Sequence, residues 1–297
     1  MSTKILEQKT DCRTDTSGDL KQKIIQYYDE CFIDYRLFWL DSKNLGMHYG
    51  YWDEDTKTHS ESLIHMNRAL SQAIDIKPGS KILDAGCGVG GSSIWLAKNF
   101  DVEVTGISLT ASQVVRAKEY AKKHGVADQV DFKEADYCNT PFADESFDIV
   151  WGLESICYAV NKQDFVAEAY RLLRKGGQIV VADGFANKTE FTPEEWKYIV
   201  AFLDGCVLPN FATVTEFQNA MENCQFNEIN YRDITKETLP SSEILYKKSK
   251  QTYPIERMLR WLKIRTASQT ANYYAAESQY QIFKQGLAGY GIFSGTK

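Results

Sequence analysis

The stretch "ILDAGCGVGG" at residues 82–91 changes from an apolar run to closely spaced glycines. Gly86, Gly88 and Gly91 satisfy the G-x-G-x-x-G spacing of a loop that joins a buried strand to a helix and lies against a dinucleotide pyrophosphate. Asp84 stands just before these glycines. The stretch therefore predicts a nucleotide-binding strand, loop and helix, and Asp84 raises the question of which nucleotide it binds.

Short apolar runs alternate with helical patterns on both sides of this loop. We expect strands at 81–86, 103–108, 130–135, 147–154 and 178–184, and helices at 92–100, 110–125 and 162–177. This alternation is typical of an α/β fold, in which a mostly parallel sheet carries helices on both faces. The helix at 110–125 has the clearest ends, because Thr110 can cap its start and Gly125 supplies the left-handed residue after it.

The remaining sequence suggests additions around this core. An aromatic-rich segment and a helical pattern at 60–74 precede it; helical patterns at 192–205 and 213–224 follow, with strands at 226–235 and 286–297. We expect four parts: a disordered lead-in at 1–22, a helical N-terminal lid at 23–77, a cofactor-binding core at 78–185, and cap helices with the last two strands at 186–297.

Composition excludes several classes of function. The 297 residues are 43% apolar and 25% charged, with a formal charge of −6, which indicates a globular protein with no general attraction for nucleic acid. The seven cysteines include no C-x-x-C pair, so neither a disulfide framework nor a zinc site is expected. With no secretory signal and no apolar run of about 20 residues, we expect a cytoplasmic protein.

The charge near the glycines separates two kinds of cofactor. A carboxylate at Asp84 would repel the pyrophosphate of NAD but would attract S-adenosylmethionine, whose methionine end carries an ammonium and a sulfonium. A dinucleotide site also needs an acid about 20 residues after the glycines. Here "GISLTASQ" at 106–113 offers Ser108 and Gln113 instead, which is less usual for either cofactor.

Four stretches together resemble class I S-adenosylmethionine-dependent methyltransferases. They are "ILDAGCGVGG", "VTGISLTASQVVRAK", "ADYCNTPFADESFDIVWGLES" and "EAYRLLRKGGQIVVAD". They are most similar to the group with tocopherol, sterol and geranyl diphosphate methyltransferases and natural-product O-methyltransferases, in which Ser or Thr with a downstream Gln commonly replaces the strand-two acid. The resemblance implies a Rossmann-like, seven-stranded, mostly parallel sheet with an antiparallel last strand, a helical lid and helical cap insertions.

The resemblance also implies roles for cofactor-binding residues. Asp84 and Gly86 would hold the methionine ammonium, and Gly88 and Gly90 would let the backbone approach. Ser108, Leu109 and Gln113 would bind the ribose, and Asp136 would accept a hydrogen bond from the adenine amine, with Tyr137 beside the ring. From the lid, Tyr28, His48 and Tyr49 would fold over the cofactor. Each of these residues also has a structural explanation: a turn cap, a tight glycine angle, a helix start or lid core.

The catalytic residues are expected near the end of the strand at 147–154. Glu154 follows the apolar run "FDIVWGL", where ligands sit in open α/β sheets and where desolvation favours a protonated carboxyl. Relatives often have a histidine shortly after this glutamate, but Tyr158 stands there, and a phenol is a poor base at neutral pH. A base would therefore be Glu154, His48 or no residue at all. The alternative to catalysis is a protein that binds S-adenosylmethionine without turnover, and the less favoured one is a nicotinamide oxidoreductase.

The flanking segments are expected to form the acceptor site. They are rich in aromatic residues, which favours oxygen or carbon of a small lipophilic or aromatic acceptor. The aromatic candidates are Trp39, Trp52, Trp196, Tyr198, Phe202, Phe211, Tyr246, Tyr253, Trp261, Tyr273 and Tyr274. The basic segment at 246–265 is either a solvated helix face, a site for a phosphorylated acceptor or a peripheral membrane contact. The histidines 48, 59 and 65 with Glu61 lack metal-site spacing, so no metal is expected.

Overall fold

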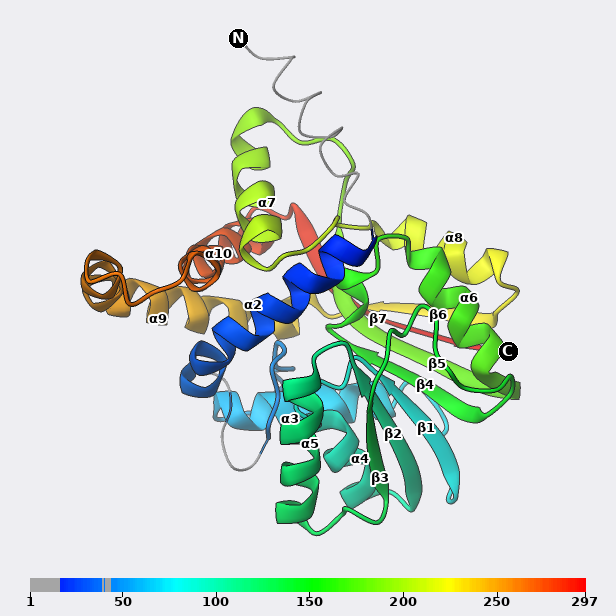
Figure 1. The fold of residues 1–297 in the computed structure, drawn as a ribbon. Coiled ribbons are helices and arrows are strands. Elements are labelled where there is room, and N and C mark those ends of the chain that lie inside the picture. The colour runs from blue at the N-terminus through cyan, green and yellow to red at the C-terminus, as the bar shows by residue number, and fades with distance from the viewer. Residues whose placement is uncertain (1–16, 39, 41–43) are drawn as a thin grey trace.

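The computed structural model describes residues 17–38, 40 and 44–297, and its centre is a seven-stranded sheet (Figure 1). The strands are β1 (Ser80–Ala85), β2 (Val102–Ser108), β3 (Val130–Glu134), β4 (Phe147–Leu153), β5 (Leu173–Ala186), β6 (Asn227–Asp233) and β7 (Ala288–Thr296). Their order is β3-β2-β1-β4-β5-β7-β6. The first five pair in parallel, and β7 is antiparallel to both β5 and β6. The expected antiparallel last strand is confirmed.

Alternating residues of the strands build two cores, one on each face of the sheet. Ile82 and Trp151 face one side, where α3 (His59–Ser71), α4 (Gly91–Asn99) and α5 (Ala111–His124) pack. Leu83 and Val150 face the other, which α6 (Lys162–Leu172) and α8 (Val214–Asn223) cover. Because both faces are buried, the strands read as continuous apolar runs rather than as alternating ones.

The other long helices form a cap beyond the carboxyl ends of the parallel strands. These are α2 (Ser17–Phe38), α7 (Pro193–Gly205), α9 (Thr235–Trp261) and α10 (Ala267–Lys284), with a short 3-10 turn at Ile156–Tyr158 after β4. Helix α10 contacts α7, α9 and α2. Figure 1 shows α9 and α10 extending together away from the sheet, with α2 running diagonally beside them. Helices α9 and α10 lie between β6 and β7 in the sequence, so this part of the cap is an insertion between two strands of the sheet.

Three expectations need correction. Residues 17–22 of the expected disordered lead-in belong to α2, where Lys21 forms an ion pair with Asp136, while residues 1–16 lie outside the described residues. Helix α6 ends at Leu172 because Leu173 takes an extended conformation and pairs with Phe147, so β5 starts earlier than predicted. Thr110 precedes α5 without a side-chain capping hydrogen bond, whereas Gly125 has the expected left-handed φ of 74°.

No helix in the described part of the chain combines the length and apolar character that crossing a bilayer requires.

Phe293→Ala should show how much β7 contributes to stability. Phe293 is buried, with ring centroids 5.0 Å from Phe217 and 4.7 Å from Tyr231. We expect its loss to reduce the free energy of unfolding by about 3–5 kcal/mol, measured in urea. The control Val115→Ala, at a side chain that is 58% exposed, should change it by about 0.5 kcal/mol or less. Equal effects of the two variants would contradict this role.

Candidate functional site

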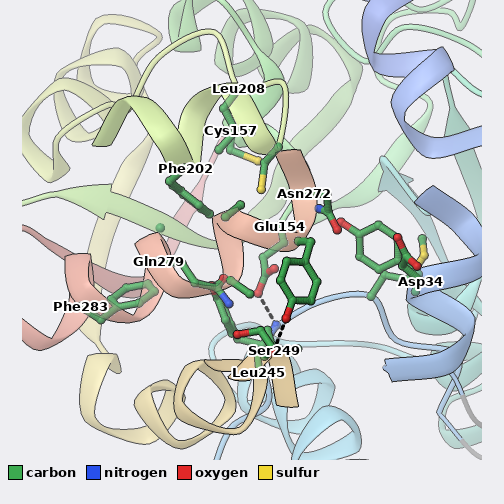
Figure 2. A pocket seen from close by; sticks show the side chains of 18 of the residues that line it. Asp34, Glu154, Cys157, Phe202, Leu208, Leu245, Ser249, Asn272, Gln279 and Phe283 are labelled. Atoms are coloured by element: carbon green, nitrogen blue, oxygen red, sulfur yellow. Dashed lines mark hydrogen bonds between the residues drawn. The ribbon is translucent and has the colours of Figure 1, made fainter. Parts of the chain in front are cut away.

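Two cavities meet at the carboxyl ends of β1, β2 and β4. The glycine-loop cavity is lined by the loop after β1, the end of β2, Tyr137, the segment after β4 and parts of the N-terminal lid. The larger cap cavity, with about 1220 Å³ of empty space that is partly open to solvent, lies between the sheet end and the cap helices (Figure 2). Tyr28, Met47, Glu154 and Tyr158 line both. Groups bound in the two cavities would therefore meet at these four side chains.

The glycine loop is closed by parts of the chain that lie far away in the sequence. Gly86 has a φ of 90°, and a Cβ there would lie 2.3 Å from the Cβ of Ser155. At Gly91, which also lines the cavity, a Cβ would lie 2.7 Å from the backbone oxygen of Leu45 in the lid. Any side chain at these positions would thus push the loop away from its neighbours.

Asp84 lies at the floor of this cavity. It is only 2% exposed, and its Oδ2 accepts a hydrogen bond of 2.6 Å from Ser93 Oγ at the start of α4. Burial raises the pKa of Asp84 to about 6, although the bond from Ser93 acts in the opposite direction. A cation beside this carboxylate would restore its charged form, so the site fits an ammonium and opposes a phosphate.

The end of β2 carries a neutral polar pair. Ser108 Oγ donates to Gln113 Oε1 at 2.7 Å, and the backbone N–H of Thr110 donates to Ser108 Oγ at 3.1 Å. Both side chains are buried and line the glycine-loop cavity. Hydroxyl and amide groups can donate to or accept from ribose hydroxyls without placing a charge there.

Glu154 stands at the boundary between the two cavities. Its Oε1 accepts hydrogen bonds from the backbone N–H of Tyr49 at 2.5 Å and from Tyr290 Oη at 2.7 Å. Its backbone has a φ of 48°, in the left-handed region, and is held by a bond from its N–H to Ala182 O at 2.9 Å. Burial raises the pKa of Glu154 to about 8, although these two donors lower it.

The other two candidates for a base differ from Glu154. Burial lowers the pKa of His48 to about 4, so this imidazole is neutral at pH 7. The Nδ1 atom of His48 lies 2.8 Å from Tyr49 O. Of the two cavities, His48 lines only the glycine-loop cavity. Burial raises the pKa of Tyr158 well above 10, so its phenol stays protonated. Tyr158 accepts from Tyr28 Oη and donates to Cys206 O, both at 3.1 Å.

The structure brings eleven of the fourteen predicted site residues together in the glycine-loop cavity. These are Tyr28, His48, Asp84, Gly86, Gly88, Ser108, Leu109, Gln113, Tyr137, Glu154 and Tyr158. Tyr49 lines the cap cavity instead. Gly90 does not line either of them, because it lies at the start of α4, where a Cβ would meet Phe132 at 2.8 Å. Asp136 is also outside both, with Oδ2 2.6 Å from Lys21 Nζ.

The cap cavity is lined by aromatic residues, but most of them are not the ones that the sequence indicates: besides three candidates, they are Tyr28, Tyr35, Tyr49, Tyr158, Phe283 and Tyr290. Of the eleven aromatic candidates, Phe202, Phe211 and Tyr273 line it, and Trp39 lies outside the described residues. Others pack elsewhere: Tyr246 stacks on Tyr280, for example. Several polar residues that line the cavity were not predicted from the sequence, namely Asp34, Asp183, Lys248, Arg265, Asn272, Gln279 and Tyr290. Two of them leave a signal in the sequence: Asp183 follows the apolar run "IVVA", and alternation in β7 places Tyr290 on the same face as buried Ile292.

The histidines are spread over separate environments. His59 stacks on Trp52, His65 Nδ1 lies 3.1 Å from Asp53 Oδ1, and Glu61 caps the start of α3. Within the described residues, no group of three or more His, Cys, Asp or Glu side chains is arranged to hold a metal ion.

The sheet order, the glycine loop and Asp84 together define the Rossmann-like fold of class I S-adenosylmethionine-dependent methyltransferases. Comparisons with known proteins agree. A family described as "Methyltransferase domain" matches residues 83–181. The 27-O-demethylrifamycin SV methyltransferase of Amycolatopsis mediterranei is 32% identical over 203 residues, which cover 66% of this chain and 71% of that protein.

Two further proteins are similar over longer stretches. The chloroplastic tocopherol O-methyltransferase of Arabidopsis thaliana is 28% identical, with 74% of this chain and 67% of that protein covered. A solved structure described as the [4+2]-cyclase SpnF has a TM-score of 0.77 at 20% identity and covers 93% of this chain and 96% of that one, which shows the shared fold. The chain belongs to the S-adenosylmethionine-dependent methyltransferases, and its cofactor is S-adenosylmethionine. This excludes the nicotinamide alternative.

Replacing Glu154 should change how stability depends on pH. Because its pKa is higher in the folded protein, at about 8, than the ordinary 4.5, the folded state binds more protons between these values, and stability falls as the pH rises from 5 to 8. The wild type should lose on the order of 1–3 kcal/mol of unfolding free energy between pH 5 and pH 8, and Glu154→Gln should not show this loss. Urea unfolding at both pH values measures the two free energies. The exposed control Glu134→Gln should keep the wild-type slope, and a wild-type slope in Glu154→Gln would contradict the assignment.

Proposed function

We propose that this enzyme transfers a methyl group from S-adenosylmethionine in the glycine-loop cavity to oxygen or carbon of a small lipophilic or aromatic acceptor in the cap cavity. The observation that carries this proposal is the meeting of the two cavities at Tyr28, Met47, Glu154 and Tyr158. Relatives described as O-methyltransferases, among them the tocopherol enzyme, support an acceptor of this kind.

The proposed division of the chain follows from the cavities. Residues 78–185 bind the cofactor. Asp84 and the backbone at Gly86 and Gly88 hold its ammonium end. Ser108, Leu109 and Gln113 hold the ribose, and Tyr137 lies beside the adenine. Residues 23–77 and 186–297 enclose the acceptor. Tyr28, His48 and Tyr49 contribute from the lid. Asp136 would act indirectly, through its ion pair with Lys21 of α2, and Gly90 through packing on Phe132.

The protein's own contribution is positioning and control of one proton. S-adenosylmethionine supplies a methyl group that its sulfonium already activates, so alignment and exclusion of water can provide roughly 7–11 kcal/mol. For a hydroxyl acceptor, the methyl carbon forms a bond to the acceptor oxygen as its bond to sulfur breaks, so the cofactor is left as a thioether. The hydroxyl proton passes to the Glu154 carboxylate. Tyr49 N–H and Tyr290 Oη orient this carboxylate. Neutral His48 and protonated Tyr158 shape the site without acting as the base.

A labelling experiment tests the function directly. The protein is incubated with methyl-labelled S-adenosylmethionine and an extract of lipophilic metabolites, and the products are separated to find which compound gains the label. Label in a lipophilic compound supports the proposal. Cofactor binding without any labelled compound would support the second candidate, a protein that binds the cofactor without turnover. Tyr158, at the position where relatives often have a histidine, favours this candidate.

Asp84→Asn should weaken cofactor binding. Loss of a buried carboxylate that faces an ammonium removes a charge-assisted hydrogen bond, so we expect a 10- to 100-fold higher Kd, about 1.4–2.8 kcal/mol. Calorimetry with S-adenosylhomocysteine measures it. Asp148→Asn, at the other end of the sheet beside Arg174, is the matched control and should bind normally. Normal binding by Asp84→Asn would remove Asp84 from the site.

Glu154→Gln should separate turnover from binding. At pH 7 a carboxyl with a pKa near 8 is mostly protonated, so glutamine replaces it with nearly the same shape and charge, and cofactor affinity should stay within about threefold. Turnover should fall by about 10²–10⁴-fold if the carboxylate accepts the proton. The wild-type rate should rise between pH 6.5 and 8.5, and the variant should lack this rise. Unchanged turnover would exclude Glu154 from proton transfer.

We also propose a cytoplasmic location, small molecules rather than nucleic acid as partners, and at most a peripheral membrane contact through the segment 246–265. The acidic overall charge supports the second of these statements, because an anionic surface repels the phosphate backbones of nucleic acid.

A further inference from the structure

Apolar side chains are concentrated on the surface where α9 ends and turns into α10. Six of the ten large exposed apolar side chains in the described part of the chain lie between residues 253 and 264. Trp261 is 80% exposed, the highest value among them, and Ile264 is 61% exposed. We call Ile255, Met258, Trp261, Leu262 and Ile264 the turn patch. An exposed tryptophan among aliphatic side chains costs free energy in water unless another surface covers it.

The turn patch is a built surface on an anchored turn. Ile255, Met258 and Leu262 repeat at helical spacing and so share a face of α9, while Glu256 on the opposite face is buried and pairs with Arg265 at 2.9 Å. Arg265 also pairs with Asp34 of α2 at 2.6 Å. These ion pairs hold the turn against α2, so the patch keeps its shape when it meets another surface.

Helix α2 extends the same surface. Its residues at 30 and 34 contact the turn, through Thr266 and Arg265 respectively. Ile33 and Leu37, the neighbouring positions on α2, are 41% and 68% exposed. Two separate segments of the chain therefore present apolar side chains side by side.

Positive charge surrounds the turn patch. Arg257, Arg260, Lys263 and, on α2, Arg36 are exposed, and residues 257–265 include no acidic residue, although the whole chain has a formal charge of −6. A tryptophan and aliphatic side chains within basic residues are the pattern of an interfacial segment that enters the headgroup region of an anionic bilayer. A second copy of the chain would instead bring the same positive charges together.

We propose that the turn patch docks on an anionic phospholipid surface, with Trp261 and Ile264 inserted among the lipids. This narrows the membrane contact of segment 246–265 to the end of α9, because the preceding turns of the helix line the cap cavity through Leu245, Ser249 and Thr252. One helix thus joins the docking surface to the acceptor site. That link rests on the proposed function: a lipophilic acceptor dissolved in the bilayer would be taken up at the surface where the enzyme docks.

Co-sedimentation with vesicles tests the docking. The full chain is mixed with vesicles of phosphatidylcholine alone or with phosphatidylglycerol. We expect binding to the anionic vesicles. The association constant should be at least tenfold lower for Trp261→Ser/Ile264→Ser, since this variant loses the apolar surface that would be buried among the lipids. Val115→Ser, at an apolar side chain 58% exposed on α5, is the matched control and should bind like the wild type.

A charge variant gives an independent measurement. Arg257→Glu/Lys263→Glu should abolish the preference for anionic vesicles, and Lys118→Glu on α5 should keep it. The proposal is overturned if the wild type binds neither kind of vesicle, or if Trp261→Ser/Ile264→Ser and Arg257→Glu/Lys263→Glu both bind as the wild type does. It is also overturned if sedimentation velocity shows a dimer that Trp261→Ser/Ile264→Ser disrupts. Calorimetry with S-adenosylhomocysteine on the same variants should match the wild type, so that a failure of docking is distinguished from a failure of the proposed reaction.

Discussion

One carboxylate oxygen joins three segments that are far apart in the sequence. Glu154 Oε1 receives the backbone N–H of Tyr49 from the lid and the hydroxyl of Tyr290 from β7, while Glu154 itself follows β4. An unpaired buried carboxyl is costly, so these two donors make closure of the lid and insertion of β7 mutually supporting. All three segments thus meet at the boundary between the glycine-loop cavity and the cap cavity, both of which contain Glu154 in their lining.

Burial gives the acidic groups of the site different properties from those of surface carboxylates. The pKa values of Asp84 and Asp183 rise to about 6 and that of Glu154 to about 8, with desolvation as the largest cause each time. Asp183 accepts hydrogen bonds from the backbone N–H groups of Cys157 and Gly184, both at 2.8 Å, and so shapes the loop after Glu154. A cation beside a desolvated acid is a favourable partner, since it compensates for the lost hydration.

The sequence predicts the sheet and the glycine-loop cavity well because both depend on local patterns. Buried strands are continuous apolar runs, and Asp84, Gly86 and Ser108 lie next to such runs. The cap cavity depends on contacts between distant helices instead: Asp34 of α2 and Arg265, which line it together, form an ion pair across 231 positions of the sequence. The same limit explains Asp136, whose partner Lys21 lies in the expected disordered lead-in. It also explains Gly90, which follows the loop in the sequence but faces Phe132.

The position of β7 in the chain has a consequence for synthesis. Tyr290 follows both α9 and α10 in the sequence, yet β7 lies between β5 and β6 in the sheet. During translation, β5 has an unpaired edge and Glu154 lacks its phenolic partner until β7 has left the ribosomal exit tunnel. A chaperone that shields this edge during translation would act at the stage when the half-made enzyme is most exposed to aggregation.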